Sequence, residues 1–152
     1  MKLRAVTAED GDALHAIFTQ PGVRRFLFDD IQLTREQTQG HVEAATTHDA
    51  WVICEDDRLV GFVSLRPTGE DVELMVAVDE RSWGRGIAFA ASAEALRYGF
   101  EIRRRNRILA AVDLPNERSH KLMGRLGFTP IGESDGARYR LRRYEALRRS
   151  GT

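Results

Sequence analysis

The fold is decided by the stretch Val72-Glu73-Leu74-Met75-Val76-Ala77-Val78 and what comes after it. The chain continues as Asp79-Glu80-Arg81-Ser82 and then Trp83-Gly84-Arg85-Gly86-Ile87-Ala88. Residues 72–78 are mostly apolar, which predicts a buried strand, and an alanine-rich segment after Ala88 predicts a helix to about Arg103. A strand, a glycine-containing turn and a helix start collect unpaired backbone N–H groups at the positive end of a helix dipole. The stretch therefore predicts an anion-binding crossover at the centre of the fold.

The composition of the turn supports this prediction. Gly84, Gly86 and Ala88 remove side-chain bulk at alternate positions, so a phosphate can approach the backbone closely. Arg81 and Arg85 add local positive charge in a chain that has a formal net charge of zero. The expected ligand is an anion.

Two common phosphate motifs do not match the turn. A P-loop ends in Gly-Lys-Ser/Thr, whereas this turn continues as Gly86-Ile87-Ala88. The dinucleotide fingerprint requires a third small residue at position 89, which is Phe89 here. ATP or GTP on a P-loop and a Rossmann-bound dinucleotide are therefore disfavoured.

Towards the N-terminus, periodicity and capping signals predict a strand and two helices. The strand covers residues 2–6 and the first helix residues 8–19, ended by Pro21-Gly22. A short helical turn or lid is expected at 23–28, and a second helix at 35–47. The other expected elements are a hairpin over 51–54 and 59–65, a strand over 108–112, a helix from Asn116 to about Gly127, and two strands around residues 134–136.

Length and composition indicate one globular domain. The chain has 152 residues, 42% hydrophobic and 30% charged, with no internal repeat, so we expect one domain over 1–147 and a frayed tail over 148–152. Zero net charge gives no general reason to bind nucleic acid or an acidic membrane. No apolar stretch approaches the roughly 20 residues of a membrane span, so a cytoplasmic protein is expected.

Two motifs together resemble a known family. Trp83-Gly84-Arg85-Gly86-Ile87-Ala88 resembles the acyl-CoA pyrophosphate loop of the GNAT superfamily of N-acetyltransferases, usually Gln/Arg-x-x-Gly-x-Gly/Ala. Trp83 replaces the usual first residue, as in the branch of Rim-type ribosomal-protein N-terminal acetyltransferases. Asn116-Glu117-Arg118-Ser119, then Leu122-Met123 and Gly127-Phe128, is similar to the Asn-containing helix of the same family. The resemblance extends from about Leu3 to Tyr144.

The resemblance implies a fold and a reaction. The fold is α+β, with a mostly antiparallel central sheet of about seven strands, splayed between the fourth and fifth strands and flanked by about four helices. The reaction moves an acetyl group from acetyl-CoA to a primary amine, on a protein N-terminus or a small molecule, by direct transfer through a tetrahedral intermediate. No metal is implied.

The same resemblance assigns cofactor contacts. The backbone of Val76 and Val78 would bind the pantetheine arm, and Asn116 would hydrogen-bond it. An N–H near Val76 or Val78 could polarise the thioester carbonyl. The pyrophosphate loop comprises Trp83, Gly84, Arg85, Gly86, Ile87 and Ala88. Trp83 is expected either to stack on the ligand or, more simply, to anchor the loop as a half-buried aromatic residue.

Candidates for catalysis are Glu73 and Ser119. Glu73 is a carboxylate in an apolar strand, so it serves either as a base or as the ion-pair partner of an arginine such as Arg66. Met123 occupies the place of the tyrosine acid found in many relatives and cannot donate a proton. Ser119 could hydrogen-bond the departing sulfur, or be a solvated hydroxyl near a helix start.

The acceptor site and the partners are less constrained. Residues 20–33 and 132–141 would form the acceptor site, with Phe26, Phe28 and Tyr139 either lining it or belonging to the core. The basic run at 103–107 is expected to be a solvated helix end rather than an RNA contact. A monomer or homodimer is expected. Alternative functions are a non-catalytic acyl-CoA-binding domain and a nucleotide- or RNA-associated module.

Overall fold

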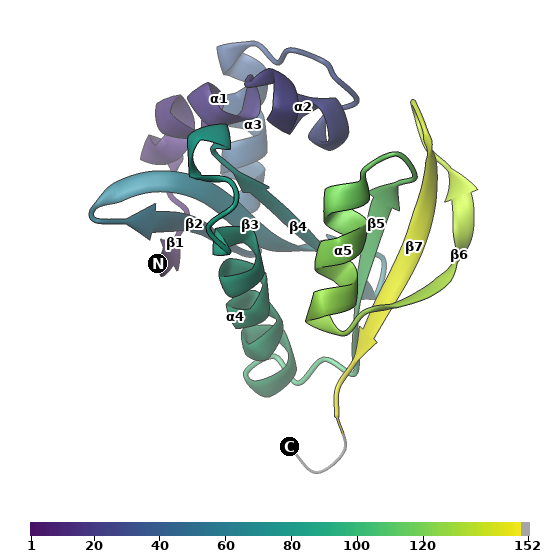
Figure 1. Ribbon diagram of the computed structural model, residues 1–152. Coiled ribbons are helices and arrows are strands. Elements are labelled where there is room, and N and C mark those ends of the chain that lie inside the picture. The colour runs from purple at the N-terminus through teal and green to yellow at the C-terminus, as the bar shows by residue number, and fades with distance from the viewer. Residues whose placement is uncertain (150–152) are drawn as a thin grey trace.

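A single mixed sheet organises the chain in the computed structural model, which describes residues 1–149 (Figure 1). Its strand order is β1-β2-β3-β4-β5-β7-β6, and β4 and β5 are the parallel neighbours. The strands are β1 Lys2–Ala5, β2 Asp49–Glu55, β3 Arg58–Thr68, β4 Asp71–Val78, β5 Arg107–Asp113, β6 Thr129–Asp135 and β7 Arg140–Leu147. The α+β fold with seven strands and a crossover helix between β4 and β5 is confirmed.

Five α-helices accompany the sheet within the described part of the chain, one more than expected. They are α1 Gly11–Phe18, α2 Pro21–Leu27, α3 Arg35–Ala45, α4 Ile87–Glu101 and α5 Glu117–Leu126, with short 3₁₀ turns at Ala8–Asp10 and Glu80–Ser82. The prediction that Pro21 only ends a helix, with a turn after it, was wrong in detail. Pro21 is the first residue of α2, where its missing N–H would have no helical partner anyway.

Local signals set the element boundaries. The Thr34 side chain accepts a hydrogen bond from the Gln37 amide at 3.1 Å and caps α3. Asp56 and Asp57 have positive φ angles of 48° and 64°, as the tight turn between β2 and β3 requires. Gly127, with a φ of 87°, ends α5 in the left-handed conformation.

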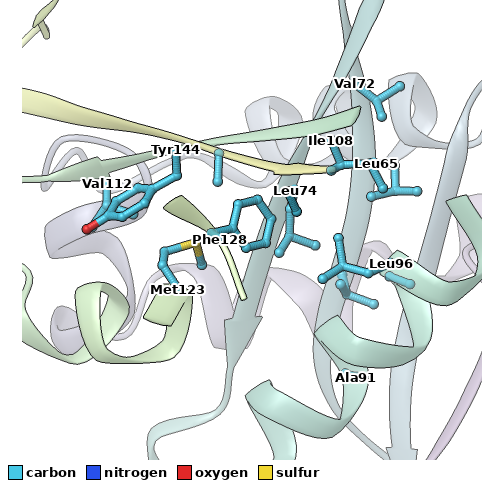
Figure 2. Packing of buried hydrophobic residues seen from close by; sticks show 14 of the residues in the cluster. Leu65, Val72, Leu74, Ala91, Leu96, Ile108, Val112, Met123, Phe128 and Tyr144 are labelled. Carbon is cyan, nitrogen blue, oxygen red and sulfur yellow. The ribbon is translucent and has the colours of Figure 1, made fainter. Parts of the chain in front are cut away.

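Two hydrophobic clusters cover the two faces of the sheet. Helices α1 to α3 pack on one face, where Phe18 meets Phe62 and Ala77 is buried. Helices α4 and α5 pack on the other face, over a cluster that contains Leu74, Ile108, Met123 and Phe128 (Figure 2). Because side chains alternate along a strand, each face of β4 and β5 can be assigned from these clusters.

The sheet divides between β4 and β5. Strands β3 and β4 are paired from Thr68↔Asp71 to Gly61↔Val78, whereas β4 and β5 are paired only at Glu73↔Leu109. Beyond that point the two strands diverge (Figure 1). The splay expected between the fourth and fifth strands is therefore present.

Two further sequence predictions were a frayed C-terminal tail over residues 148–152 and the absence of a membrane-spanning segment. Among residues 1–149, no helix is both long and apolar enough to cross a bilayer. Arg148, assigned to the tail, donates its backbone N–H to the Asn106 carbonyl at 2.9 Å. Residues 150–152 lie outside the described residues.

Asp79 fixes the turn that follows β4. Its side chain is only 3% exposed and accepts a hydrogen bond from Arg81 Nη2 at 2.8 Å and from the Arg81 backbone N–H at 3.0 Å. The Arg81 side chain lowers the pKa of Asp79 to about 2, against the opposing effect of burial. The ionised carboxyl therefore stabilises the turn between β4 and α4.

Asp79→Asn is expected to lower the free energy of unfolding at pH 7 by about 2 kcal/mol. The reason is that a carboxyl group whose pKa is lowered by folding stabilises the folded state at every pH where the unfolded chain carries that group ionised. The difference from wild type is full above an ordinary Asp pKa of 3.8 and is lost as the pH falls towards 2. Urea unfolding across this range measures it. Asp12→Asn, in an exposed pair with Arg35, is the matched control, and an Asp79→Asn deficit independent of pH would contradict the prediction.

Candidate active site

A cavity of about 1060 Å³ passes through the gap between β4 and β5. On the side of α4 and α5 it is lined by Val76, Val78 and Met123. On the side of α1 to α3 it is lined by Phe28 and Met75. The cavity therefore connects the two faces of the sheet, so two ligands could enter from opposite sides and meet between the strands.

The backbone of Val76 and Val78 faces this gap. The Asp79 amide donates to the Val60 carbonyl at 2.8 Å, which marks Val60 and Asp79 as a pair that exchanges hydrogen bonds. In an antiparallel ladder such pairs recur every second residue, so Val76 and Val78 direct their N–H groups away from β3 and towards β5. Among the described strands, β5 pairs with β4 only at Glu73, so these amides are available to a ligand.

The predicted loop has the backbone of an anion cradle. Gly84 and Gly86 have φ angles of 79° and 77°, and Gly86 is the N-cap of α4. A Cβ added at either glycine would meet nothing within 4 Å, so these glycines are required for conformation and the space above them is open. Ile87 and Ala88 form the first turn of α4, at the positive end of its dipole. All of these residues line the cavity.

The two arginines that were predicted to add positive charge at this cradle both form ion pairs. Arg81 pairs with Asp79 at 2.8 Å, and Arg85 pairs with Glu55 of the hairpin at 2.9 Å. Arg81 is thus paired with a carboxylate two residues before it, and Arg85 with one on a hairpin distant in sequence, so neither charge is free. Cations on α5 line the cavity instead, namely Arg118, Lys121 and Arg125.

Trp83 anchors the loop. Its indole Nε1 donates to the Val78 carbonyl at 2.8 Å, and the Arg118 guanidinium lies 4.1 Å from its ring centroid. The ring is 36% exposed and lines the cavity. The anchoring role expected for a half-buried aromatic residue is present.

Asn116 and Ser119 form one unit at the start of α5. Asn116 Oδ1 accepts from the Ser119 amide at 3.3 Å, and Asn116 Nδ2 donates to Ser119 Oγ at 3.0 Å. Because Ser119 Oγ accepts this hydrogen bond, its own O–H proton remains free to be donated. Both residues line the cavity, with buried Met123 one turn further along the helix.

Glu73 lies where the gap closes. Its Oε1 is 3.3 Å from Arg66 Nη2, and its side chain is 19% exposed at the wall of the cavity. The ion pair anticipated as the alternative to a base is thus formed, at the single position where β4 and β5 are still paired. The assignment of Glu73 as base stays a prediction.

The aromatic residues predicted for the acceptor site separate into two groups. Phe26 and Phe28 line the cavity, and Phe28 also packs on Phe18 with a centroid distance of 5.3 Å. Tyr139 is outside the lining but lies 5.9 Å from Phe26, between centroids. Segments 20–33 and 132–141 therefore meet.

Asp113, which the sequence analysis did not select, also lines the cavity. It is the last residue of β5, and only 8% of it is exposed. Burial raises the pKa of Asp113, the negative charge of Asp29 raises it further, and Arg138 opposes them. The only signal in the sequence was a carboxylate directly after the apolar run 108–112.

His120 fixes the junction between β5 and α5. Its Nε2 lies 3.1 Å from the carbonyl oxygens of Asp113 and Leu114, and its Nδ1 lies 2.6 Å from Tyr144 Oη. Carbonyl oxygens only accept, so Nε2 carries a proton. His120 is therefore a structural link between β5, α5 and β7.

The start of α2 is hydrogen-bonded to the turn that leads from β4 to α4. Gln20 Nε2 donates to Asp79 Oδ1 at 3.1 Å, and Gln20 Oε1 accepts from the Glu80 amide at 2.9 Å. The Gly22 amide donates to Glu80 Oε1 at 2.5 Å. The wall formed by α2 and the cradle at the start of α4 thus share one set of contacts.

Two other hypotheses can be compared with the structure. In the basic run, Arg103 pairs with Asp49, and Arg107 pairs with Asp71 and Glu145. These carboxylates reduce the charge that RNA could use. For the residues that the structure describes, no cluster of His, Cys, Asp and Glu could hold a metal ion.

Known proteins with similar sequences are acetyltransferases. The chain is 26% identical over 143 residues to the uncharacterized N-acetyltransferase p20 of Bacillus licheniformis, covering 87% of this chain and 80% of that protein. It is 24% identical over 140 residues to spermidine N(1)-acetyltransferase of Escherichia coli strain K12, covering 88% of this chain and 75% of that protein.

Solved structures share the fold. A GNAT-family acetyltransferase from Bacillus anthracis aligns with a TM-score of 0.84 at 19% identity, over 96% of this chain and 93% of that one. A ribosomal-protein-alanine N-acetyltransferase from Brucella melitensis aligns with a TM-score of 0.80 at 23% identity, over 97% and 99%. Spermidine N-acetyltransferase from Vibrio cholerae, in complex with CoA and spermine, aligns with a TM-score of 0.80 at 19% identity, over 97% and 95%.

The family assignment follows from the sequence itself. The family model described as acetyltransferase (GNAT) domain matches residues 1–129, which is well over half of the chain. This range contains both the glycine loop at Gly84 and Gly86 and the Asn116 helix start. The protein is a member of the GNAT acetyltransferase family.

Proposed function

We propose that the protein transfers an acetyl group from acetyl-CoA to a primary amine, on a small molecule or a protein N-terminus. The observation that carries this proposal is the cavity that crosses the sheet between β4 and β5. It combines the open cradle of Gly84 and Gly86 with the unpaired amides of Val76 and Val78. A thioester and an amine entering from opposite faces would meet there.

The relatives support an amine acceptor. The names of two of them refer to spermidine, and that of another to a ribosomal-protein alanine. In this chain the carboxylates of Asp29 and Asp113 line the acceptor side of the cavity. Small cationic amines are therefore the acceptors to test first.

The residues fit acetyl-CoA in two places. The amides at the start of α4, above Gly84 and Gly86, would hold the pyrophosphate, with Arg118 and Lys121 supplying positive charge. The backbone groups of Val76 and Val78 that point away from β3 would hold the pantetheine arm. When bound, acetyl-CoA supplies a thioester carbonyl for the amine to attack and a thiol leaving group.

The chain contributes a donor at each end of the thioester. The Val76 amide would donate to the carbonyl oxygen, where negative charge develops. The Ser119 hydroxyl, whose oxygen already accepts from Asn116, would donate its proton to the departing sulfur. Met123 cannot perform this role.

The closest alternative is an acyl-CoA-binding domain without turnover. It would use the same cradle and the same Asn116 helix start. Binding of acetyl-CoA without acetylation of any amine in a broad screen would favour that alternative over an enzyme.

Gly86→Ala is expected to weaken acetyl-CoA binding at least 10-fold and to lower stability by about 1–2 kcal/mol, because alanine is strained at a φ of 77°. The control is Gly124→Ala, a helical position with open space around the Cβ, which should bind normally. Calorimetric titration with acetyl-CoA and thermal unfolding provide the two measurements. Undiminished binding to Gly86→Ala would remove the loop from the cofactor site.

Ser119→Ala is expected to lower kcat about 100-fold while the affinity for acetyl-CoA changes less than 3-fold, because a general acid acts only as the sulfur departs. The Asn116 cap of the Ser119 backbone amide is retained in this variant. Steady-state kinetics and equilibrium titration separate the two effects. Equal losses in kcat and in affinity would indicate a structural role for the hydroxyl.

Glu73→Gln tests the base assigned from the sequence. The glutamine keeps the size of the side chain but removes both the charge and the Arg66 ion pair. If Glu73 is the base, the variant loses at least 100-fold in kcat/KM together with the acidic limb of its pH profile. Unchanged turnover across pH would remove Glu73 from catalysis.

A further inference from the structure

We propose that Asp113 is the carboxylate that binds the ammonium group of the acceptor and takes its proton. This inference rests on the proposed acetyl transfer and names the acceptor side of that site. Four observations carry it: the position of Asp113 on β5, its burial, the absence of a partner for its carboxylate, and the charges around it.

Asp113 faces the acceptor side at the open end of the gap. On β5, Ala110 and Val112 belong to the cluster under α4 and α5, so the alternation of the strand turns Asp113 towards α1 to α3. Counting forward from the pair Glu73↔Leu109, Asp113 is level with Ala77. It therefore lies across the gap from the level of Val76 and Val78, whose N–H groups point away from β3.

The Glu73 side chain points to the same face of the sheet as Asp113 but lies at a different position along the gap. The register places Glu73 four residues before Ala77, roughly 13 Å back at the strand rise of about 3.3 Å per residue. There the strands are still paired and Arg66 holds the carboxylate. Glu73 thus lies at the closed end of the gap, whereas Asp113 lies four residues further along, at the open end.

Asp113 as a whole residue is only 8% exposed, and its carboxylate has no partner among the described residues. Its backbone carbonyl is held by the Asn116 amide at 2.9 Å and by His120 Nε2 at 3.1 Å, so its position is fixed. Within residues 1–149, no hydrogen bond or ion pair reaches its carboxylate. An ionised carboxylate in such a place is costly, and a cationic ligand would offset the cost.

The surrounding charges favour a cation. Asp29, in the loop after α2, adds a second negative charge, while Arg138, from the loop between β6 and β7, opposes it. Arg138 is already engaged by Asp30 at 3.3 Å. His120 faces the carbonyl of Asp113. Burial raises the pKa of Asp113, which makes it a stronger base than an exposed aspartate.

The chemical step is balanced. One proton leaves the acceptor ammonium for an Asp113 carboxylate oxygen, which frees the nitrogen electron pair. That pair attacks the acetyl carbonyl carbon and forms a tetrahedral intermediate, whose collapse breaks the carbon–sulfur bond. The departing sulfur takes the proton of the Ser119 hydroxyl, and the second nitrogen proton replaces it on Ser119. The net release is one proton, which Asp113 passes to solvent.

The test compares Asp113→Asn, Asp113→Glu and the exposed control Asp12→Asn. Spermidine is the acceptor probe. Three quantities are measured: kcat/KM as a function of pH with saturating acetyl-CoA, the affinity for spermidine of the protein saturated with CoA by calorimetry, and the melting temperature.

For Asp113→Asn we expect a 100- to 10,000-fold loss in kcat/KM, loss of the acidic limb of the pH profile, and spermidine affinity at least 10-fold weaker. The melting temperature at pH 7 should be unchanged or higher, because the variant removes an unpaired buried charge. Since the pKa of Asp113 is raised in the folded state, this gain should fade as the pH falls through that raised pKa and should be absent below the ordinary Asp value of 3.8. Asp113→Glu should recover part of the activity, and Asp12→Asn should match wild type.

Three results would overturn the inference. The first is a kcat/KM of Asp113→Asn within 3-fold of wild type. The second is an acidic limb that persists in the pH profile of Asp113→Asn. The third is a fall in the melting temperature of Asp113→Asn that Asp113→Glu also shows. If the wild type acetylates no amine, the proposed function fails. The calorimetric comparison still tests Asp113 in that case, because equal spermidine affinity in wild type and Asp113→Asn contradicts the assignment.

Discussion

The single pairing of β4 with β5, at Glu73 and Leu109, is the constraint on which the rest of the structure depends. Parallel neighbours normally continue their ladder, because unpaired backbone groups inside a protein are costly. Here the two strands separate instead, and α4 and α5 pack across the divided sheet. The separation leaves the amides of Val76 and Val78 facing a cavity, where a ligand with hydrogen-bond acceptors could pair with them.

Local conformation determined the parts of the site that the sequence could predict. Gly84 and Gly86 adopt positive φ angles, and Asn116 caps α5, because each of these features depends on only a few consecutive residues. The partners of charged side chains depend on the tertiary fold. Glu55 reaches Arg85 from a distant hairpin, so the loop charge expected from the sequence is neutralised. The cradle was therefore predictable, but its electrostatics were not.

The two carboxylates of the cavity show the same limit. Glu73 stands out in the sequence because it interrupts an apolar strand, yet Arg66 holds it where the strands remain paired. Asp113 follows an apolar run and resembles an ordinary turn residue. Three properties distinguish Asp113: the face of the sheet to which its side chain points, the burial of the residue, and the absence of a partner for its carboxylate within the described chain. Each of these three properties requires the assembled sheet.

The cavity wall formed by α2 and the glycine cradle at the start of α4 are not independent surfaces. Gln20 bridges Asp79 and Glu80, and Glu80 in turn accepts from the Gly22 amide, so α2 is fixed through the residues that lead into α4. A ligand that orders the loop before α4 also restrains α2, and the same contacts transmit restraint in the opposite direction, because coupling between two sites is reciprocal. The splayed strands open the cavity through the sheet, and these hydrogen bonds connect the elements on its two sides.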